Sequence, residues 1–141
     1  MFLGEYRHIL DSKNRMSLPA KLRKLLGKKI IITRGLDRCL SVYSYLEGKK
    51  YLESLESFSD HQANNRAFNR FMLSGAIETE VDSAGRILIP DFLKQEAKLD
   101  TKVVIIGARN RLELWNEDQW TNYLKKVESE IESLAETLHE K

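Results

Sequence analysis

Two short stretches of the chain place an aspartate four residues before an arginine in a similar context. They are DSKNRMSLP at residues 11–19 and DSAGRILIP at residues 82–90. The carboxylates of Asp11 and Asp82 can accept hydrogen bonds from backbone N–H groups two or three residues further on, which closes a tight turn. The guanidinium that follows is planar and can bind a phosphate or a guanine edge with two hydrogen bonds. The pattern therefore allows two kinds of chemistry, a structural ion pair or anion binding.

The residue before each arginine must allow a positive φ if the turn is to close. Gly85 does so without steric cost, and Asn14 is the best substitute among the other residues. Arg15 and Arg86 then stand at the start of the two return strands. Each can pair with an aspartate and lock its hairpin, or face DNA, and the residues alone leave both interpretations open.

Charge separates the two copies. The basic residues around the first arginine are Lys13, Lys21, Arg23 and Lys24, with Lys28 and Lys29 close behind. The second arginine has Ala84, Phe92 and Lys94 at the matching places, with Asp91 and Glu96 nearby. We therefore expect the first copy to carry most of the DNA contact, Arg15 to matter more than Arg86, and the second copy to act mainly as scaffold.

The repetition extends beyond the two turns. YRHIL and AIETEV predict a strand before each aspartate, and PAKLRKLLG and PDFLKQEAKLD predict a short helix whose first turn contains the proline. Gly27 stands where a left-handed residue would end the first of these helices. IIIT with CLSVY, and VVII with RLELW, then predict a second strand pair in each copy. A unit of about 45 residues is too small to bury a core alone, so we expect two intertwined copies to share one barrel-like core.

Longer helices are predicted outside the repeats. Ser44 and Glu47 fit a capping box that starts a helix at about residues 45–57, and SDHQ at residues 59–62 is expected to cap the next one. Asn116 and Gln119 start a C-terminal helix. Its apolar residues recur at heptad spacing and are Trp120, Leu124, Val127, Ile131, Leu134 and Leu138. Trp115 and Trp120 can form a hydrophobic staple. Packing of this apolar seam on the internal helices is favoured, and a subunit contact is the alternative.

Composition limits the class of protein. The 141 residues are 42% hydrophobic and 31% charged, which is typical of one folded domain or of two small units sharing a core. No apolar run approaches the roughly 20 residues that span a bilayer. Cys39, the only cysteine, excludes an intrachain disulfide, favours a reducing cytoplasm and is expected to be a core residue. Net charge is +6 over residues 1–48 and −4 over the rest, which suggests an anionic partner on one face.

The sequence also disfavours an enzymatic function. His8, His61 and His139 lie in no motif that links them to Cys39 or to a nucleophilic serine, and each is expected to be a surface or interface residue. The sequence has no glycine-rich phosphate loop after a strand and no Cys/His spacing suited to zinc. We expect no enzymatic activity, no cofactor and no metal.

The stretches MFLGEYRHILDSKNRMSLPAKLR, VDSAGRILIPDFL and LELW closely resemble the MraZ family, and the resemblance covers nearly the whole chain. The halves of this family are each similar to the AbrB-type swapped-hairpin DNA-binding module. The resemblance implies an α+β fold of two intertwined β-β-α-β-β repeats that form a double-split β-barrel. The repeats are expected at residues 5–47 and 76–119, with a helical connector at 48–75 and a C-terminal helix at 120–141.

The resemblance also implies a function. It implies a transcriptional regulator of the division and cell wall gene cluster, including its own gene, in the cytoplasm and at the nucleoid. Such a protein binds tandem short repeats in double-stranded promoter DNA as a ring-shaped homo-oligomer, an octamer or a dodecamer, without contact to a membrane. Arg15 and Arg86 match the motif arginines, and Lys13, Asn14, Lys21, Arg23 and Lys24 complete the candidate DNA contacts. Asn14 departs from the glycine that is usual in the first motif.

Two other binding functions remain as alternatives. An oligomeric interaction scaffold without a DNA role would use the same apolar seam and aromatic faces. An AbrB-like antitoxin would share the turn, but such antitoxins usually carry one copy and a disordered tail.

Overall fold

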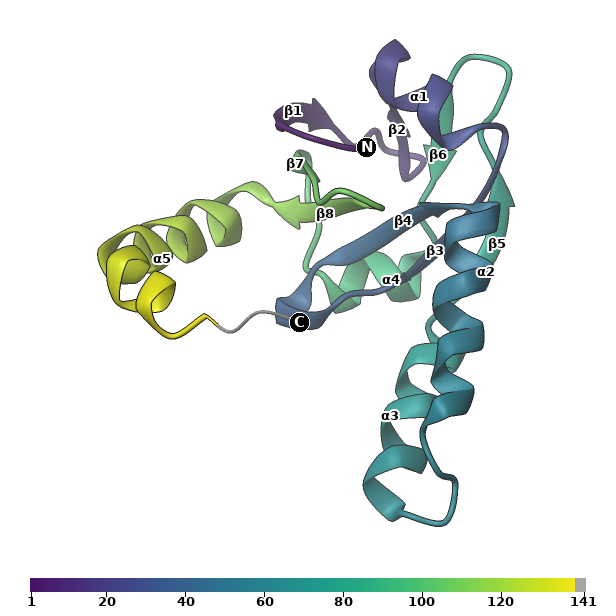
Figure 1. Ribbon diagram of the computed structural model, residues 1–141. Helices are drawn as coiled ribbons and strands as arrows, with labels where there is room; N and C mark the ends of the chain where they lie inside the picture. The colour runs from purple at the N-terminus through teal and green to yellow at the C-terminus, as the bar shows by residue number, and fades with distance from the viewer. Residues whose placement is uncertain (139–141) are drawn as a thin grey trace.

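The computed structural model describes residues 1–138, which form a mixed α+β fold (Figure 1). The strands of the first half are β1 (Glu5–Ile9), β2 (Arg15–Ser17), β3 (Lys29–Arg34) and β4 (Leu40–Ser44), and those of the second half are β5 (Ile77–Glu80), β6 (Arg86–Leu88), β7 (Lys102–Gly107) and β8 (Leu112–Asn116). The helices are α1 (Ala20–Leu26), α2 (Tyr45–Ser54), α3 (Ala63–Ser74), α4 (Asp91–Glu96) and α5 (Glu117–Glu136). Short 3₁₀ turns occupy Leu36–Arg38 and Leu55–Ser57.

The two halves of the chain exchange their opening strands. Six antiparallel strands form one sheet in the order β1-β7-β8-β4-β3-β5, so β1 pairs with β7 of the second half and β5 pairs with β3 of the first. The short strands β2 and β6 pair with each other in a separate two-stranded ribbon. The strand pairs at both ends of the sheet therefore join one half of the chain to the other.

One hydrophobic core is built from both halves. Leu22 of α1 and Ile32 of β3 are buried in the same cluster as Ile87 of β6, Leu93 of α4 and Ile105 of β7. Burial of each such side chain stabilises the fold by about 1.5–3 kcal/mol, so the shared cluster holds the two halves together. Cys39 is also buried, against Val104 and Trp115 in a second small cluster, as expected.

The helices of the connector begin where the sequence predicts, but one cap differs. Glu47 donates its backbone N–H to the hydroxyl of Ser44 over 3.3 Å, and α2 passes into the 3₁₀ turn that ends at Ser57. The stretch at residues 59–62 directly precedes α3 as predicted, but it provides no side-chain cap. The cap position is Gln62, which makes no side-chain cap bond. The hydroxyl of Ser59 instead accepts from the N–H of His61 over 3.2 Å, so it closes the loop before the helix.

The short helices start one residue later than predicted. Pro19 and Pro90 are cap residues with extended ψ values of 139° and 147°, and the helices begin at the residues that follow. Gly27 has a positive φ of 77° as expected, but its ψ of −174° is extended and not left-handed helical. The chain therefore passes directly from α1 into β3.

The C-terminal helix does not pack where we favoured. Asn116 caps α5 by accepting from the N–H of Gln119 over 3.0 Å, and the staple rings of Trp115 and Trp120 lie 5.1 Å apart, as predicted. However, α5 contacts β7 and β8 and leaves the sheet on the side away from α2 and α3 (Figure 1). Ile131 stays 53% exposed. Packing on the internal helices is excluded because β8, which leads into α5, directs it away from them.

Two further expectations can be placed on the structure. His8 is half-buried in β1 and His61 is exposed, whereas His139 lies outside the described residues. No helix within residues 1–138 combines the length and the apolar character needed to cross a membrane.

Candidate nucleic-acid interface

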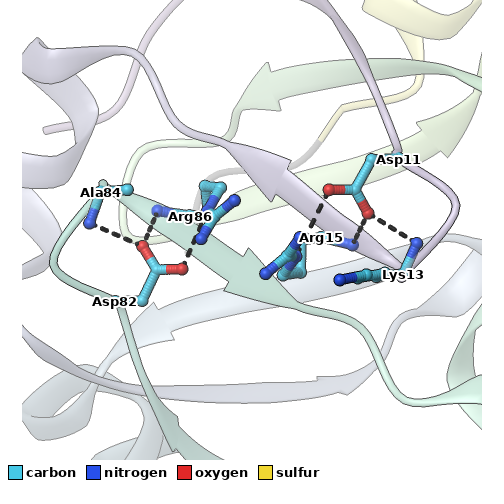
Figure 2. A network of polar contacts seen from close by, with 6 residues as sticks. All are labelled: Asp11, Lys13, Arg15, Asp82, Ala84 and Arg86. Atoms are coloured by element: carbon cyan, nitrogen blue, oxygen red, sulfur yellow. Dashed lines mark hydrogen bonds and ion pairs between the residues drawn. The ribbon is translucent and has the colours of Figure 1, made fainter.

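The first turn (residues 11–15) closes as its residues predict. One carboxylate oxygen of Asp11 accepts from the backbone N–H of Lys13 over 2.8 Å and from that of Arg15 over 2.9 Å (Figure 2). Asn14 takes the positive φ, at 61°. The turn is therefore held by a side chain that bonds to its own backbone, which fixes the start of β2.

The second turn (residues 82–86) repeats this geometry. Asp82 accepts from the backbone N–H of Ala84 over 2.9 Å and from that of Arg86 over 2.8 Å (Figure 2). Gly85 supplies the positive φ, at 79°. The roles predicted for Asp82 and Gly85 in the turn are those that the structure gives them.

Each arginine is held at one edge only. Nε of Arg15 lies 3.4 Å from Asp11, and Nε of Arg86 lies 3.0 Å from Asp82. Within residues 1–138 the terminal nitrogens of both guanidinium groups have no hydrogen-bond partner, and the side chains are 30% and 33% exposed. The structural ion pair is thus present, and it leaves the outer edge of each guanidinium able to bind a further anion.

Each turn also affects the ionisation of its own aspartate. The backbone N–H of Arg15 is the main reason that the pKa of Asp11 lies below its ordinary value, and that of Arg86 acts in the same way on the pKa of Asp82. The guanidinium groups lower both pKa values further. Both carboxylates are therefore ionised at neutral pH, as the paired arginines require.

Both arginines lie on one face of the β2–β6 ribbon. Met16 pairs with Ile87 in the register and both are buried, whereas Arg15 lies opposite Leu88. Because side chains alternate along a strand, Arg15 and Arg86 point away from the core on the same side. The pairing of β2 with β6 thus brings both motif arginines into one small sheet.

The carbonyl of each turn holds the chain of the other half. The N–H of Leu18 donates to the carbonyl of Gly85 over 3.0 Å, and the N–H of Ile89 donates to the carbonyl of Asn14 over 2.8 Å. Helix α1, which follows Leu18, therefore lies beside the second turn, and α4, which follows Ile89, lies beside the first.

This exchange reverses the electrostatic neighbourhoods expected from the sequence. Arg23 of α1 lies against Gly85, since a β-carbon added there would collide with its guanidinium, and Lys24 lines the same region. Asp91 and Lys94 of α4 instead bond to Asn14, at 2.6 Å and 3.0 Å. The expectation that Arg23 and Lys24 surround Arg15 is wrong, because sequence distance does not follow the strand exchange.

The remaining candidates lie on the surface. Lys13 projects from the first turn and Lys21 from the start of α1, and both are exposed. Lys28 lies beside the second turn, although the sequence places it with the first arginine. Only knowledge of the strand pairing could assign it there, since β3 begins at the next residue and pairs with β5 of the other half.

Comparison with known proteins finds a matching family model and similar sequences. The family model described as MraZ protein, antitoxin-like, matches the chain twice, at residues 1–71 and 72–140, which fits a duplicated repeat. The chain is 45% identical over 138 residues to the transcriptional regulator MraZ of Caldanaerobacter subterraneus subsp. tengcongensis, and 47% identical over 138 residues to that of Natranaerobius thermophilus. Each alignment covers 98% of this chain and 96% of the relative. The protein of the same name from Halothermothrix orenii is 46% identical over 140 residues, which is 99% of this chain and 98% of the relative.

Proposed function

The chain belongs to the MraZ family, and we propose on that basis that it regulates transcription by binding double-stranded DNA. The relatives described above are named as transcriptional regulators, and the alignments cover nearly their whole length. The proposal makes the protein a binding module that acts without catalysis, in the cytoplasm and at the nucleoid.

The observation that carries the proposal is the shared face of the β2–β6 ribbon. Arg15 and Arg86 project from it with their inner nitrogens fixed by the two aspartates. A two-stranded ribbon fits the major groove of B-DNA, where arginine can bind guanine O6 and N7 or a phosphate. Fixing Nε in advance lowers the conformational entropy that each arginine loses on binding.

The arrangement of the repeats supports a finer description of the fold. We assign the repeats to residues 5–47 and 76–119, the connector to 48–75 and the C-terminal helix to 120–141. The exchange of β1 and β5 between the halves supports a swapped-hairpin, double-split β-barrel, because each repeat then completes the sheet of the other.

The DNA target follows from the family resemblance. We assign it to tandem short repeats in the promoter of the division and cell wall gene cluster, including the gene of this protein. One ribbon with two arginines would bind weakly, mostly through phosphates. Several linked ribbons raise the effective concentration, but only where the DNA repeats match their spacing.

A ring-shaped homo-oligomer would supply those linked ribbons. Ile131 and Leu134 on the seam of α5 are 53% and 42% exposed, and a monomer leaves them in water. A groove of about 960 Å³ between α2 and α3 has apolar walls that include Leu52, Leu55 and Leu73. Since α5 cannot reach the groove of its own chain, the groove of a second copy is the partner that we assign to it.

Fluorescence anisotropy with labelled promoter DNA tests the proposal. Arg15→Ala and Arg86→Ala should each weaken binding to repeat DNA by about tenfold or more, since each removes a charge-assisted contact worth about 1.5–3 kcal/mol. Lys125→Ala on the exposed part of α5 is the matched control and should leave the affinity unchanged. Equal affinity of the wild-type protein for repeat and scrambled DNA would favour the interaction scaffold instead.

A further inference from the structure

A basic hollow lies beside the second turn. Its volume is about 410 Å³, and its lining residues come from the end of α1 and from the turn itself, namely Arg23, Lys24, Gly27, Lys28, Val81, Asp82, Ser83 and Gly85. The two walls belong to different halves of the chain. The hollow therefore exists only because α1 of the first half packs over the turn of the second.

The charge in this hollow is predominantly positive and partly unpaired. Asp82 is its only acid, and this carboxylate is already engaged by Arg86 and by two backbone N–H groups. Nε of Arg23 is buried and has no hydrogen-bond partner in the part of the chain that the structure describes. Lys24 is exposed, and Lys28 has one loose contact with Glu80 at 3.5 Å, where both side chains are largely in water.

The equivalent place beside the first turn is closed. The residue matching Arg23 there is Lys94, and the residue matching Gly85 is Asn14. The amine of Lys94 donates to Asn14 over 3.0 Å, and the amide of Asn14 donates to Asp91 over 2.6 Å. The cation at the first turn is thus satisfied by a protein side chain, whereas glycine at the second turn offers Arg23 no such acceptor.

We propose that the hollow beside Gly85 is a binding site for a backbone phosphate of double-stranded DNA. This inference rests on the proposed function and deepens it. A phosphodiester oxygen between Arg23 and Lys24 would bind the terminal nitrogens of the guanidinium and the lysine amine, on the half of the ribbon that carries Arg86. The second turn then makes the stronger electrostatic contact, which is the reverse of the order that the sequence favours.

The asymmetry between Asn14 and Gly85 provides the test. Gly85→Asn gives the second turn the residue of the first, and asparagine can adopt the positive φ of 79° found there. Its side chain would displace the guanidinium of Arg23 and occupy the hollow. Lys24→Gln removes one cation from the rim of the hollow without touching either turn. Asn14→Gly is the matched control at the first turn.

Binding of fluorescein-labelled repeat DNA should be measured by anisotropy at several salt concentrations. Gly85→Asn should lower the affinity about tenfold, as expected for the loss of one charge-assisted hydrogen bond. Both it and Lys24→Gln should reduce the slope of log K against log salt by about 0.9, the value for one phosphate contact. Asn14→Gly should keep the wild-type slope or increase it, because it releases Lys94.

The outcomes separate this site from the proposed function. Thermal melts establish that each variant is folded. If Gly85→Asn unfolds, the slope of log K against log salt for Lys24→Gln decides whether the hollow binds a phosphate. Wild-type slopes in both variants, with binding still lost in Arg86→Ala, would overturn the phosphate site alone. Failure of the wild-type protein to bind DNA would overturn the site and the proposed function together.

Discussion

Lys94 donates a hydrogen bond of 3.0 Å to the side chain of Asn14, although 80 positions separate the two residues. The contact joins helix α4 of the second half to the turn of the first. Because Asn14 also donates to Asp91 on the same helix, one turn is bonded to two residues of the other half. The turns therefore do more than reverse the chain, since they hold the two halves together.

A double-mutant cycle measures this cross-repeat contact. Asn14→Gly preserves the positive φ of the turn, and Lys94→Met retains most of the apolar stem of the lysine. Urea unfolding of the wild type, the two single variants and the double variant should give a coupling energy between Asn14 and Lys94 of about 0.5–1.5 kcal/mol. This is the value expected for a partly buried hydrogen bond. The cycle of Asn14→Gly with Lys102→Met, at the exposed start of β7, should show no coupling. Additive effects of Asn14→Gly and Lys94→Met would contradict the contact.

The β2–β6 ribbon depends on its inner face. Ile87 is fully buried, whereas its neighbour Leu88 is 52% exposed. Ile87→Ala should lower the free energy of unfolding by about 2–5 kcal/mol, because it leaves a cavity in the shared core. Leu88→Ala on the same strand should change it by no more than about 0.5 kcal/mol. Urea unfolding monitored by tryptophan fluorescence measures both, and equal effects would show that the ribbon does not pack as described.

The sequence predicts the two turns well because their geometry is local. Asp82, Gly85 and Arg86 determine a turn through bonds that span at most four residues, so no knowledge of distant partners is needed. The repeat also predicts the order of strands and short helices. The α5 cap and staple are correct for the same reason, since Asn116 bonds to a residue three positions away.

The side chains that the strand exchange brings together are what the sequence could not reveal. Pairing of β5 with β3, or with a strand of its own half, would satisfy the same alternation of apolar side chains. The strand pairing decides whether Arg23 lies near Arg15 or near Arg86. A prediction of charged neighbours from sequence distance alone therefore places Arg23 wrongly. The direction of α5 is a second example, because its apolar spacing predicts a buried face without specifying what covers it.

The carboxylates of the two turns should make stability depend on pH. The pKa values of Asp11 and Asp82 lie below the ordinary value of 3.8 in the folded protein. Their stabilising effect is therefore present above the unfolded pKa and is lost as the pH falls through the folded values. The double variant Asp11→Asn/Asp82→Asn should be less stable than the wild type at pH 7, and the difference should narrow towards pH 3. Urea midpoints at pH 7, 5 and 3 check this, and a constant difference would contradict it.

Cys39 should be inert in the folded protein. Burial, helped by the nearby carboxylates of Glu113 and Asp37, raises the pKa of its thiol to about 12. The thiol also donates to the carbonyl of Leu36 over 3.2 Å. Since the thiolate is the reactive form, a disulfide reagent such as DTNB should react at pH 8 only after denaturant is added. Rapid reaction of the native protein would show that this region opens.

The exposed seam of α5 should control the oligomeric state. Ile131 lies near the middle of the seam, and the heptad spacing places Glu128 and Glu130 beside it. Like charges at these positions oppose the pairing of two α5 helices, whereas the α2–α3 groove offers the apolar walls of Leu52, Leu55 and Leu73. A head-to-tail contact of this kind would form the proposed ring only where its rotation closes.

Ile131→Glu places a charge in that contact and should reduce the mass measured by light scattering after gel filtration. Helix content by circular dichroism should stay unchanged, because the side chain is 53% exposed in the monomer. Ser129→Glu, which faces away from the seam, is the control and should keep the wild-type mass. A wild-type mass for Ile131→Glu, or an equal loss in both variants, would exclude the seam as the subunit contact. If the seam is correct, the smaller Ile131→Glu species should also lose its preference for tandem repeats over a single repeat, since linked ribbons are what the repeats select.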